Sequence, residues 1–161
     1  MFMKKLFALI LILCLLAVPA LGETVDVVTT ASQIDYFGTL MTAEELVASI
    51  GSYNGFFSVS TVNADGTPNV GFFIFSAMEH EGKLYLQFGL AENQTRQNME
   101  NGSAVMVMYA PLPTEGSYPM VGARLMCEAV PEGELLETLA TLMPQNGSKL
   151  IYEVVEIRPL G

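Results

Sequence analysis

The sequence predicts a mainly β protein, an antiparallel barrel of six short strands with helices at its periphery. Runs rich in β-branched and aromatic residues recur along the chain, separated by clusters of Gly, Pro, Asn and Asp. The helical segments are too few to act as crossovers between parallel strands, so we expect an antiparallel sheet. Two of the strands are apolar on both faces, which indicates that something also covers the outside of the barrel.

The first 22 residues are typical of a secretory signal peptide. Lys4 and Lys5 precede an apolar run over residues 6–18, and Ala20-Leu21-Gly22 carries small residues at the positions that signal peptidase favours. The apolar run is shorter than the roughly 20 residues of a membrane-spanning helix. No small residues precede Cys14, so a lipoprotein signal is not expected. We therefore expect cleavage after Gly22, a secreted or extracytoplasmic protein, and a single domain over residues 23–161; retention of the segment as an anchor is the alternative.

The expected mature chain is strongly acidic. Removing residues 1–22 leaves five Lys and Arg against seventeen Asp and Glu, a net charge of 5 − 17 = −12. Such a charge disfavours nucleic acid and anionic membrane surfaces as partners. Cys127 is then the only cysteine, which excludes an internal disulfide. His80 is the only histidine and lies between two glutamates, so no metal site is expected.

Capping and periodicity place the individual elements. The capping box Thr42-Ala-Glu-Glu45 predicts a helix that ends at Gly51. Further helices are expected over 93–100 and 133–143, where the leucines of the second recur at helical spacing. Residues 24–30 are expected to be a strand or an ordered arm. The six strands are expected over 55–62, 69–76, 84–88, 103–109, 120–130 and 150–157.

The strand predicted over 69–76 does not alternate between polar and apolar residues. One of its faces carries Val70, Phe72 and Ile74, and the other carries Gly71, Phe73 and Phe75. The strand over 103–109 repeats this pattern from Ala104 to Tyr109. A single small barrel buries only its inside. The outer face of these strands is therefore expected to meet a second subunit, a flat ligand, or both.

Three segments carry a resemblance to a known family: GFFSVSTVNADGTPNVGFFIF, GKLYLQFGLAENQTRQNMENGSAVMVMY and GARLMCEAV. Their order and spacing resemble the pyridoxamine 5'-phosphate oxidase-like, FMN-binding split-barrel family, over about residues 42–130. The resemblance implies a six-stranded split barrel that forms a homodimer, with flavin mononucleotide (FMN) in the groove between the subunits. It also implies that the isoalloxazine ring lies on the backbone near Asn69, Val70, Gly71 and Phe72.

The same resemblance implies a phosphate site at the start of the helix over 93–100. Asn93, Gln94, Thr95 and Arg96 combine helix-start amides, a hydroxyl and a guanidinium, all of which can bind an anion, and Asn98 follows at the family's usual spacing. The alternative interpretation is an ordinary helix cap and a solvated helix face. Arg124, in the middle of a predicted strand, is a second candidate for the phosphate or a member of a structural ion pair.

The sequence departs from true pyridoxamine phosphate oxidases. Phe72, Phe73 and Phe75 stand where phosphate-binding arginines would be sought, so oxidation of pyridoxamine phosphate is not expected. A bound flavin supplies the redox chemistry itself, so the scarcity of catalytic side chains is no objection to an enzyme. The sequence thus favours a secreted FMN-binding oxidoreductase. The alternative is a non-catalytic binder of flavin, haem or another flat cofactor, or a structural dimer with an empty groove.

Overall fold

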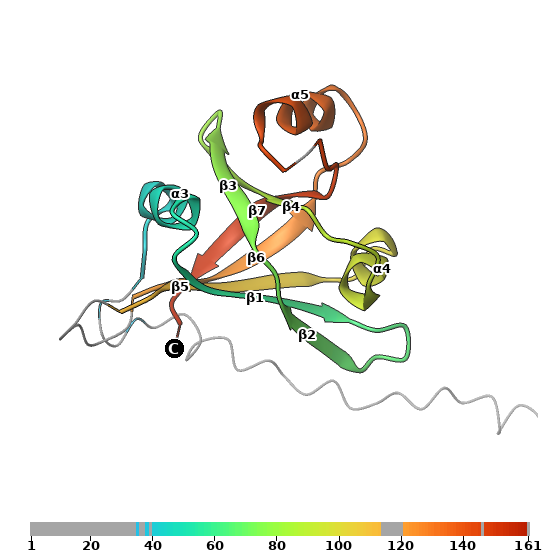
Figure 1. The fold of residues 1–161 in the computed structure, drawn as a ribbon, viewed down its shortest axis with the longest axis horizontal. Helices are drawn as coiled ribbons and strands as arrows, with labels where there is room; N and C mark the ends of the chain where they lie inside the picture. The colour runs from blue at the N-terminus through green and yellow to red at the C-terminus, as the bar shows by residue number, and fades with distance from the viewer. Residues whose placement is uncertain (1–34, 36–37, 39, 114–120, 146, 161) are drawn as a thin grey trace, which may run out of the picture.

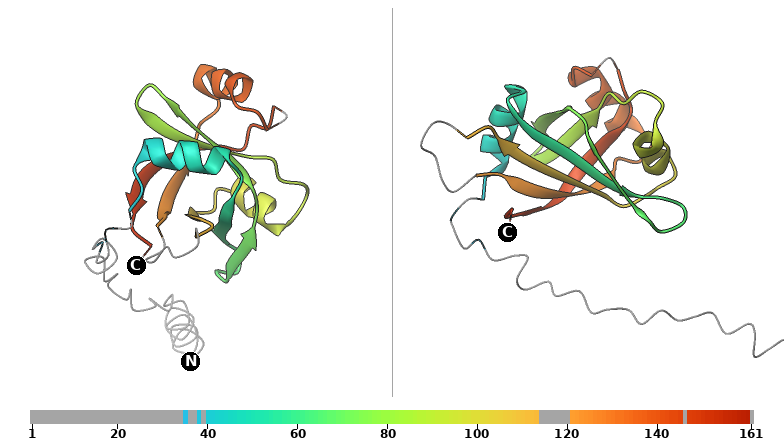
Figure 2. Two further views of the ribbon diagram at one scale, coloured as in Figure 1. Left: turned by 60° about the vertical axis from the view of Figure 1, so that its left-hand side comes forward. Right: turned by 60° about the horizontal axis from the view of Figure 1, so that its bottom comes forward.

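The computed structural model describes residues 35, 38, 40–113, 121–145 and 147–160. Within them, one antiparallel sheet curls into a barrel that stays open between its two edge strands, and helices lie around it (Figures 1 and 2). The strand order is β2-β1-β5-β6-β7-β4-β3. The strands are β1 (Gly55–Val62), β2 (Pro68–Phe72), β3 (Phe75–His80), β4 (Lys83–Phe88), β5 (Val105–Pro111), β6 (Ala123–Ala129) and β7 (Ile151–Arg158). The helices are α3 (Ala43–Gly51), α4 (Gln94–Glu100) and α5 (Glu134–Leu142).

The predicted fold class is confirmed, but the described residues form seven strands rather than six. The single strand predicted over 69–76 is in fact two strands, because the chain leaves β2 at Phe73 and enters β3 at Phe75. β2 pairs with β1 and β3 pairs with β4, so the two halves of this segment lie at opposite edges of the sheet. Residues 24–30 and Met120, which were also predicted to be in strands, lie outside the described residues.

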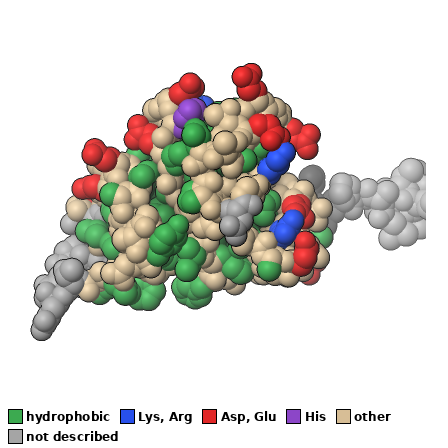
Figure 3. All heavy atoms as spheres, turned by 45° about the horizontal axis from the view of Figure 1, so that its top comes forward, with side chains coloured by type: hydrophobic (Ala, Val, Ile, Leu, Met, Phe, Trp, Pro, Cys, Tyr) green, Lys and Arg blue, Asp and Glu red, His purple; other side chains and the backbone are tan. Residues whose placement is uncertain are grey.

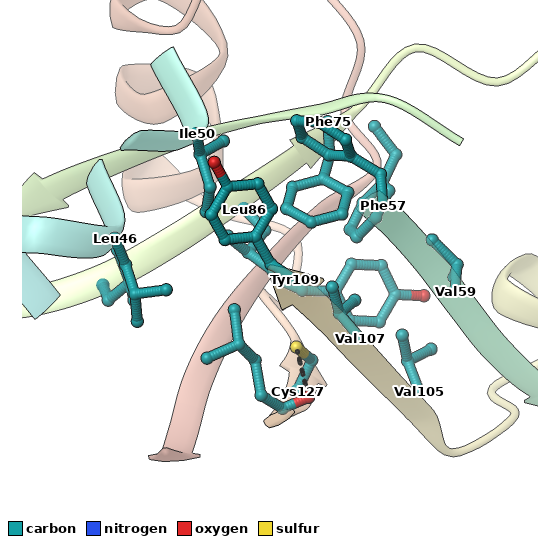
Figure 4. Close-up of a cluster of buried hydrophobic side chains, with 14 of the residues drawn as sticks. Leu46, Ile50, Phe57, Val59, Phe75, Leu86, Val105, Val107, Tyr109 and Cys127 are labelled. Carbon is teal, nitrogen blue, oxygen red and sulfur yellow. Dashed lines mark hydrogen bonds between the residues drawn. The ribbon is translucent and has the colours of Figure 1, made fainter. Parts of the chain in front are cut away.

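The inward faces of the strands form the main core, shown in Figure 4. The ring of Phe57 meets Phe75 at a centroid distance of 5.1 Å and Tyr109 at 5.0 Å, both edge to face. Helix α3 packs Leu46 and Ile50 against this core, and both side chains are fully buried. Its predicted capping box is present: Thr42 Oγ1 accepts from the Glu45 amide, and the Glu45 carboxylate accepts from the Thr42 amide at 2.8 Å.

Helix α5 covers a smaller hydrophobic cluster on the other side of β4 and β7. Leu136 and Leu139 of the helix are buried there with Tyr85 and Ile151 of the two strands. The predicted helix boundaries, 133–143, agree with the observed helix and its flanking caps. No helix in the described part of the chain is long and apolar enough to cross a membrane.

The outside of β2, β1 and β5 carries large apolar side chains that no described part of the chain covers. The ladder register places Phe72, Ser58 and Met108 side by side in one row across these strands. We call this surface the outer face; its large exposed hydrophobic residues are Phe56, Val62, Val70, Phe72 and Met108, which are 40–74% exposed. Hydrophobic side chains gather along the lower edge of the molecule in Figure 3, whereas acidic side chains lie around its upper part and its right-hand side.

The close approach of β1 to β5 requires a glycine at Gly55. A Cβ there would lie 2.7 Å from the Ala110 carbonyl oxygen and 2.7 Å from the Tyr109 ring. Gly55→Ala is therefore expected to lower the free energy of unfolding by about 1–3 kcal/mol, through overpacking against backbone. Gly51→Ala is the control, because a Cβ at the end of α3 meets nothing within 4 Å. Urea denaturation measures both; equal stability of the two variants would contradict the packing argument.

Candidate functional site

A cluster of neutral polar side chains ties β1, β2 and α4 together at one end of the barrel. The side-chain amide of Asn69 donates to Thr61 Oγ1 at 3.0 Å and to Thr95 Oγ1 at 2.9 Å. Asn98 Nδ2 donates to Thr61 Oγ1 at 3.0 Å and to Asn63 Oδ1 at 2.8 Å. These five residues are called the amide cluster below. Its hydroxyls and amides satisfy one another, as buried polar groups require.

The local sequence explains how the amide cluster forms. Thr61 and Asn69 are directly opposite in the β1–β2 ladder and therefore share a face. Asn93 caps α4, with its side chain accepting from the Arg96 amide at 2.9 Å. This start places Thr95 and Asn98 three residues apart on the same side of the helix, where both are buried against the strands.

A hollow of about 590 Å³ lies beside the amide cluster, between α4 and the turn that joins β1 to β2. Five of the ten lining residues are carboxamides and none is charged, although apolar atoms form the larger part of the exposed lining. The lining residues are Val62, Asn63, Ala64, Gln94, Gln97, Asn98, Asn101, Gly102, Ser103 and Ala104. We call it the amide hollow. Gln94 Nε2 donates to Asn98 Oδ1 at 2.8 Å, which joins the hollow to the amide cluster. Such a lining offers uncharged donors and acceptors, which suit hydroxyl, amide or heterocyclic groups.

β2 and β3 provide a second kind of binding surface. Each pairs on one side only within the described sheet, so each presents backbone N–H and C=O groups along its other edge. The side chains of Val70, Phe72 and Ile74 beside this edge are 56–74% exposed. An exposed polar edge flanked by apolar side chains can hold a flat aromatic molecule that has donors and acceptors at its rim.

Gly71 allows the chain to change direction between the two edge strands. It lies opposite Val59, and a Cβ built there would come within 3 Å of the Phe73 ring. The missing side chain leaves room for the Phe73 ring to pack over Gly71 and against the core, and a larger residue would displace that ring. Gly71 therefore shapes the edge rather than offering a side chain to a ligand.

Arg96 points away from the amide cluster. Its Nε donates to Glu100 at 2.7 Å, and one terminal nitrogen lies 3.3 Å from Glu92 and donates to the Leu90 carbonyl at 3.2 Å. The hydrogen bond and the charge of Glu100 raise the pKa of the guanidinium above its ordinary value. The side chain lines a different hollow, of about 410 Å³, together with residues such as Gln145 and Lys149.

The structure thus brings together part of the predicted cofactor site. Asn69, Thr95 and Asn98 belong to the amide cluster, and Gln94 joins them; Asn93 is the helix cap. Val70 and Phe72 lie on the outer face, and Gly71 points inward. Contact of these nine positions with a ligand stays a prediction.

Sequence reasoning missed Thr61, Asn63 and Gln97. The available signal was weak: Thr61 is a polar residue at an inward position of a strand, and four carboxamide residues recur at 94, 97, 98 and 101.

Cys127 is not a reactive group in this fold. Burial raises the pKa of its thiol to about 12, which leaves it protonated at neutral pH. Burial likewise raises the pKa of Tyr152 to about 12, and its hydroxyl donates to the Met99 carbonyl at 3.3 Å. No group of three or more His, Cys, Asp or Glu side chains in the described residues could hold a metal ion.

The hydrogen bonds of the amide cluster are expected to contribute to the free energy of unfolding. Asn98→Ala removes two donated hydrogen bonds and one accepted one at a buried position, so it is expected to lower the free energy of unfolding by about 1–3 kcal/mol. Gln97→Ala, at an exposed position one residue earlier, is the control and is expected to change it by no more than about 0.5 kcal/mol. Thermal denaturation compares the two. A stability loss of the same size in both variants would show that the cluster is not a structural tie.

The chain is similar to known proteins in its fold rather than in its sequence. No protein-family model matches the sequence, and neither does any curated protein. An FMN-binding protein from Syntrophomonas wolfei superposes with a TM-score of 0.50 at 17% identity, covering 74% of this chain and 86% of the other. A variant of HupZ from group A Streptococcus superposes with a TM-score of 0.51 at 23% identity, covering 74% of this chain and all of the other. The chain therefore has the split-barrel fold that the sequence resemblance implies.

Proposed function

We propose that the protein is a flavin-binding homodimer that acts as an oxidoreductase. The observation that supports this most is the combination of an unpaired strand edge, the apolar outer face and the amide hollow, all next to β2. A flavin has three parts that match them: an apolar ring system, a ring edge with hydrogen-bond donors and acceptors, and a chain of hydroxyls. The FMN-binding protein that shares the fold supports the same ligand class.

The residues present fit the ring and the hydroxyl chain of a flavin. Backbone groups along Asn69–Phe72 can pair with the donors and acceptors at the ring edge, and Val70 and Phe72 can cover an apolar ring surface. Gln97 and Asn101 project carboxamides into the amide hollow, where hydroxyls can be bound. A bound flavin would supply the electron or hydride transfer, and the chain would orient it and shield it from water.

Flavin binding itself can be measured directly. Protein purified from cells is expected to show flavin absorbance bands, and the stripped protein is expected to quench the fluorescence of added riboflavin or FMN in a saturable way at micromolar concentration or below. A haem absorbance band would favour the haem-binding alternative, and absence of any bound or bindable chromophore would favour an empty structural dimer. Reduction of bound flavin by a nicotinamide or another donor would distinguish an oxidoreductase from a passive binder.

The proposed dimer rests on the outer face. Five large hydrophobic side chains stand exposed there on adjacent strands, and contiguous patches of this kind mark interaction sites in soluble proteins. A second copy of the chain would cover them with an interface of at least about 1,600 Å² in total. In that arrangement the strand edge of one subunit lies near the partner, so the ligand groove would be completed by two copies.

Phe72→Glu tests the dimer, because it places a charge at the most exposed residue of the outer face. The variant is expected to be a folded monomer by light scattering at micromolar concentration, whereas the wild type is a dimer, and its flavin affinity is expected to fall at least tenfold. Leu142→Glu is the matched control: Leu142 is also exposed but lies on α5. The dimer proposal fails if the wild type is itself a stable monomer.

The resemblance of the first 22 residues to a secretory signal peptide supports export as part of the proposal. We propose cleavage after Gly22, so that the mature protein begins at Glu23. Intact-mass analysis of protein recovered outside the cytoplasm checks this, and a mass that includes Met1 would contradict it.

A further inference from the structure

The described residues that line the amide hollow offer no positive charge to the phosphate group of FMN. We infer that the site takes a flavin whose side chain ends without charge, so that riboflavin binds more tightly than FMN. The inference rests on the proposed flavin binding but goes beyond it, because it names the form of the ligand. It follows from the hydrogen bonds, ion pairs and burial of the groups that were expected to bind the phosphate.

Arg96 is the first of these donors. Its guanidinium is shared between Glu92, Glu100 and the Leu90 carbonyl, on the side of α4 that faces the other hollow. To reach a phosphate at the amide cluster it would have to leave both carboxylates. Those carboxylates would then remain near the incoming dianion and repel it, so the exchange gains little.

The other donors expected for the phosphate are buried or engaged. Thr95 is 3% exposed, so its hydroxyl, which accepts from Asn69, is closed off from a ligand in the hollow. The side chain of Asn93 binds the Arg96 amide, which removes one helix-start donor. α4 has seven residues, fewer than two full turns, so it has little macrodipole to offer an anion.

Among the described residues, no other Lys or Arg of the same subunit replaces Arg96 at the amide hollow. Lys83 pairs with Glu153, Lys149 with Glu137, and Arg158 with Glu156, and Arg124 Nε donates to the Pro159 carbonyl at 2.7 Å. None of the described residues that line the hollow is charged. A phosphate ester carries about −1.5 to −2 charges near neutral pH. It would enter an acidic protein at a place where none of the described lining residues of the same subunit is positive.

An uncharged hydroxyl chain, by contrast, matches the neutral side chains that line the amide hollow. Gln94, Gln97 and Asn101 are exposed residues of the hollow and present both donors and acceptors. A hydroxyl chain can exchange hydrogen bonds with water for bonds to these carboxamides without leaving a charge uncompensated. The phosphate would have to give up much stronger hydration for the same neutral partners. The hollow is therefore expected to favour a flavin side chain that ends in a hydroxyl over one that ends in a phosphate.

A titration of purified, stripped protein with riboflavin and with FMN tests the inference. Riboflavin is expected to bind at least tenfold more tightly than FMN. Raising the salt concentration from ~0.02 M to ~0.5 M is expected to strengthen FMN binding, because salt screens the repulsion between the phosphate and the acidic protein. FMN binding that is equal or tighter, or that weakens with salt, would overturn the inference and leave the flavin proposal standing. If neither flavin binds, the proposed function fails and the inference with it.

Three variants test whether the end of the flavin side chain lies in the amide hollow. Arg96→Ala is expected to change FMN affinity no more than Lys83→Ala, a remote variant that removes the same charge. Gln97→Lys places a cation in the hollow and is expected to improve FMN binding at least tenfold while riboflavin binding changes less than twofold. Thr138→Lys on α5 is the charge-matched control and should shift neither ligand. A selective loss of FMN in Arg96→Ala, or no gain in Gln97→Lys, would contradict the proposed position of the flavin side chain.

Discussion

The link between β2 and β3 is the constraint on which the rest of the structure depends. These two strands are separated by only Phe73 and Ile74, a spacing at which a tight hairpin would pair them and close the barrel. A tight hairpin, however, needs left-handed backbone at its central residues, which a β-branched residue strongly disfavours. The chain makes such a turn between β3 and β4, where Glu81 and Gly82 have φ values of 52° and 76°. Neither Phe73 nor Ile74 has a positive φ, and there the chain passes from one edge of the sheet to the other.

The open barrel leaves one end to be closed and two strand edges without a partner strand, and the described part of the chain covers only the first of these. The open end near the β1–β2 turn is closed by α4, through neutral hydrogen bonds of Thr61, Asn69 and Asn98 rather than through hydrophobic packing alone. The unpaired edges and the outer face have no such cover among the described residues. One end of the molecule is thus internally satisfied, whereas the adjoining surface keeps unpaired backbone groups and apolar side chains available for a partner or ligand.

Much of the fold could be predicted from the sequence, because helix starts and strand positions depend on residues that are close together in the chain. The capping box at Thr42 fixed the start of α3, and alternation over 55–62 placed β1, since caps and periodicity act within a few residues. The break at Phe73 was missed because a run of apolar residues looks the same whether it is one strand or two. The position of Arg96 was also out of reach: a helix start brings donors close in sequence, but whether a guanidinium turns toward Asn69 or toward Glu100 depends on where the acidic side chains lie in three dimensions.

The outer face and the strand edge are adjacent, and this couples the two proposed roles. A second subunit that covers Phe72 also narrows the space over the β2 edge, and a flat ligand on that edge adds apolar area for the partner to bury. Each event therefore completes part of the surface that the other needs. By linkage, a ligand that binds the dimer better than the monomer must strengthen the dimer by the same factor. The acidic net charge opposes association at long range, so short-range burial at Phe72 and its neighbours has to outweigh it, and a bound neutral ring increases that burial without adding to the repulsion.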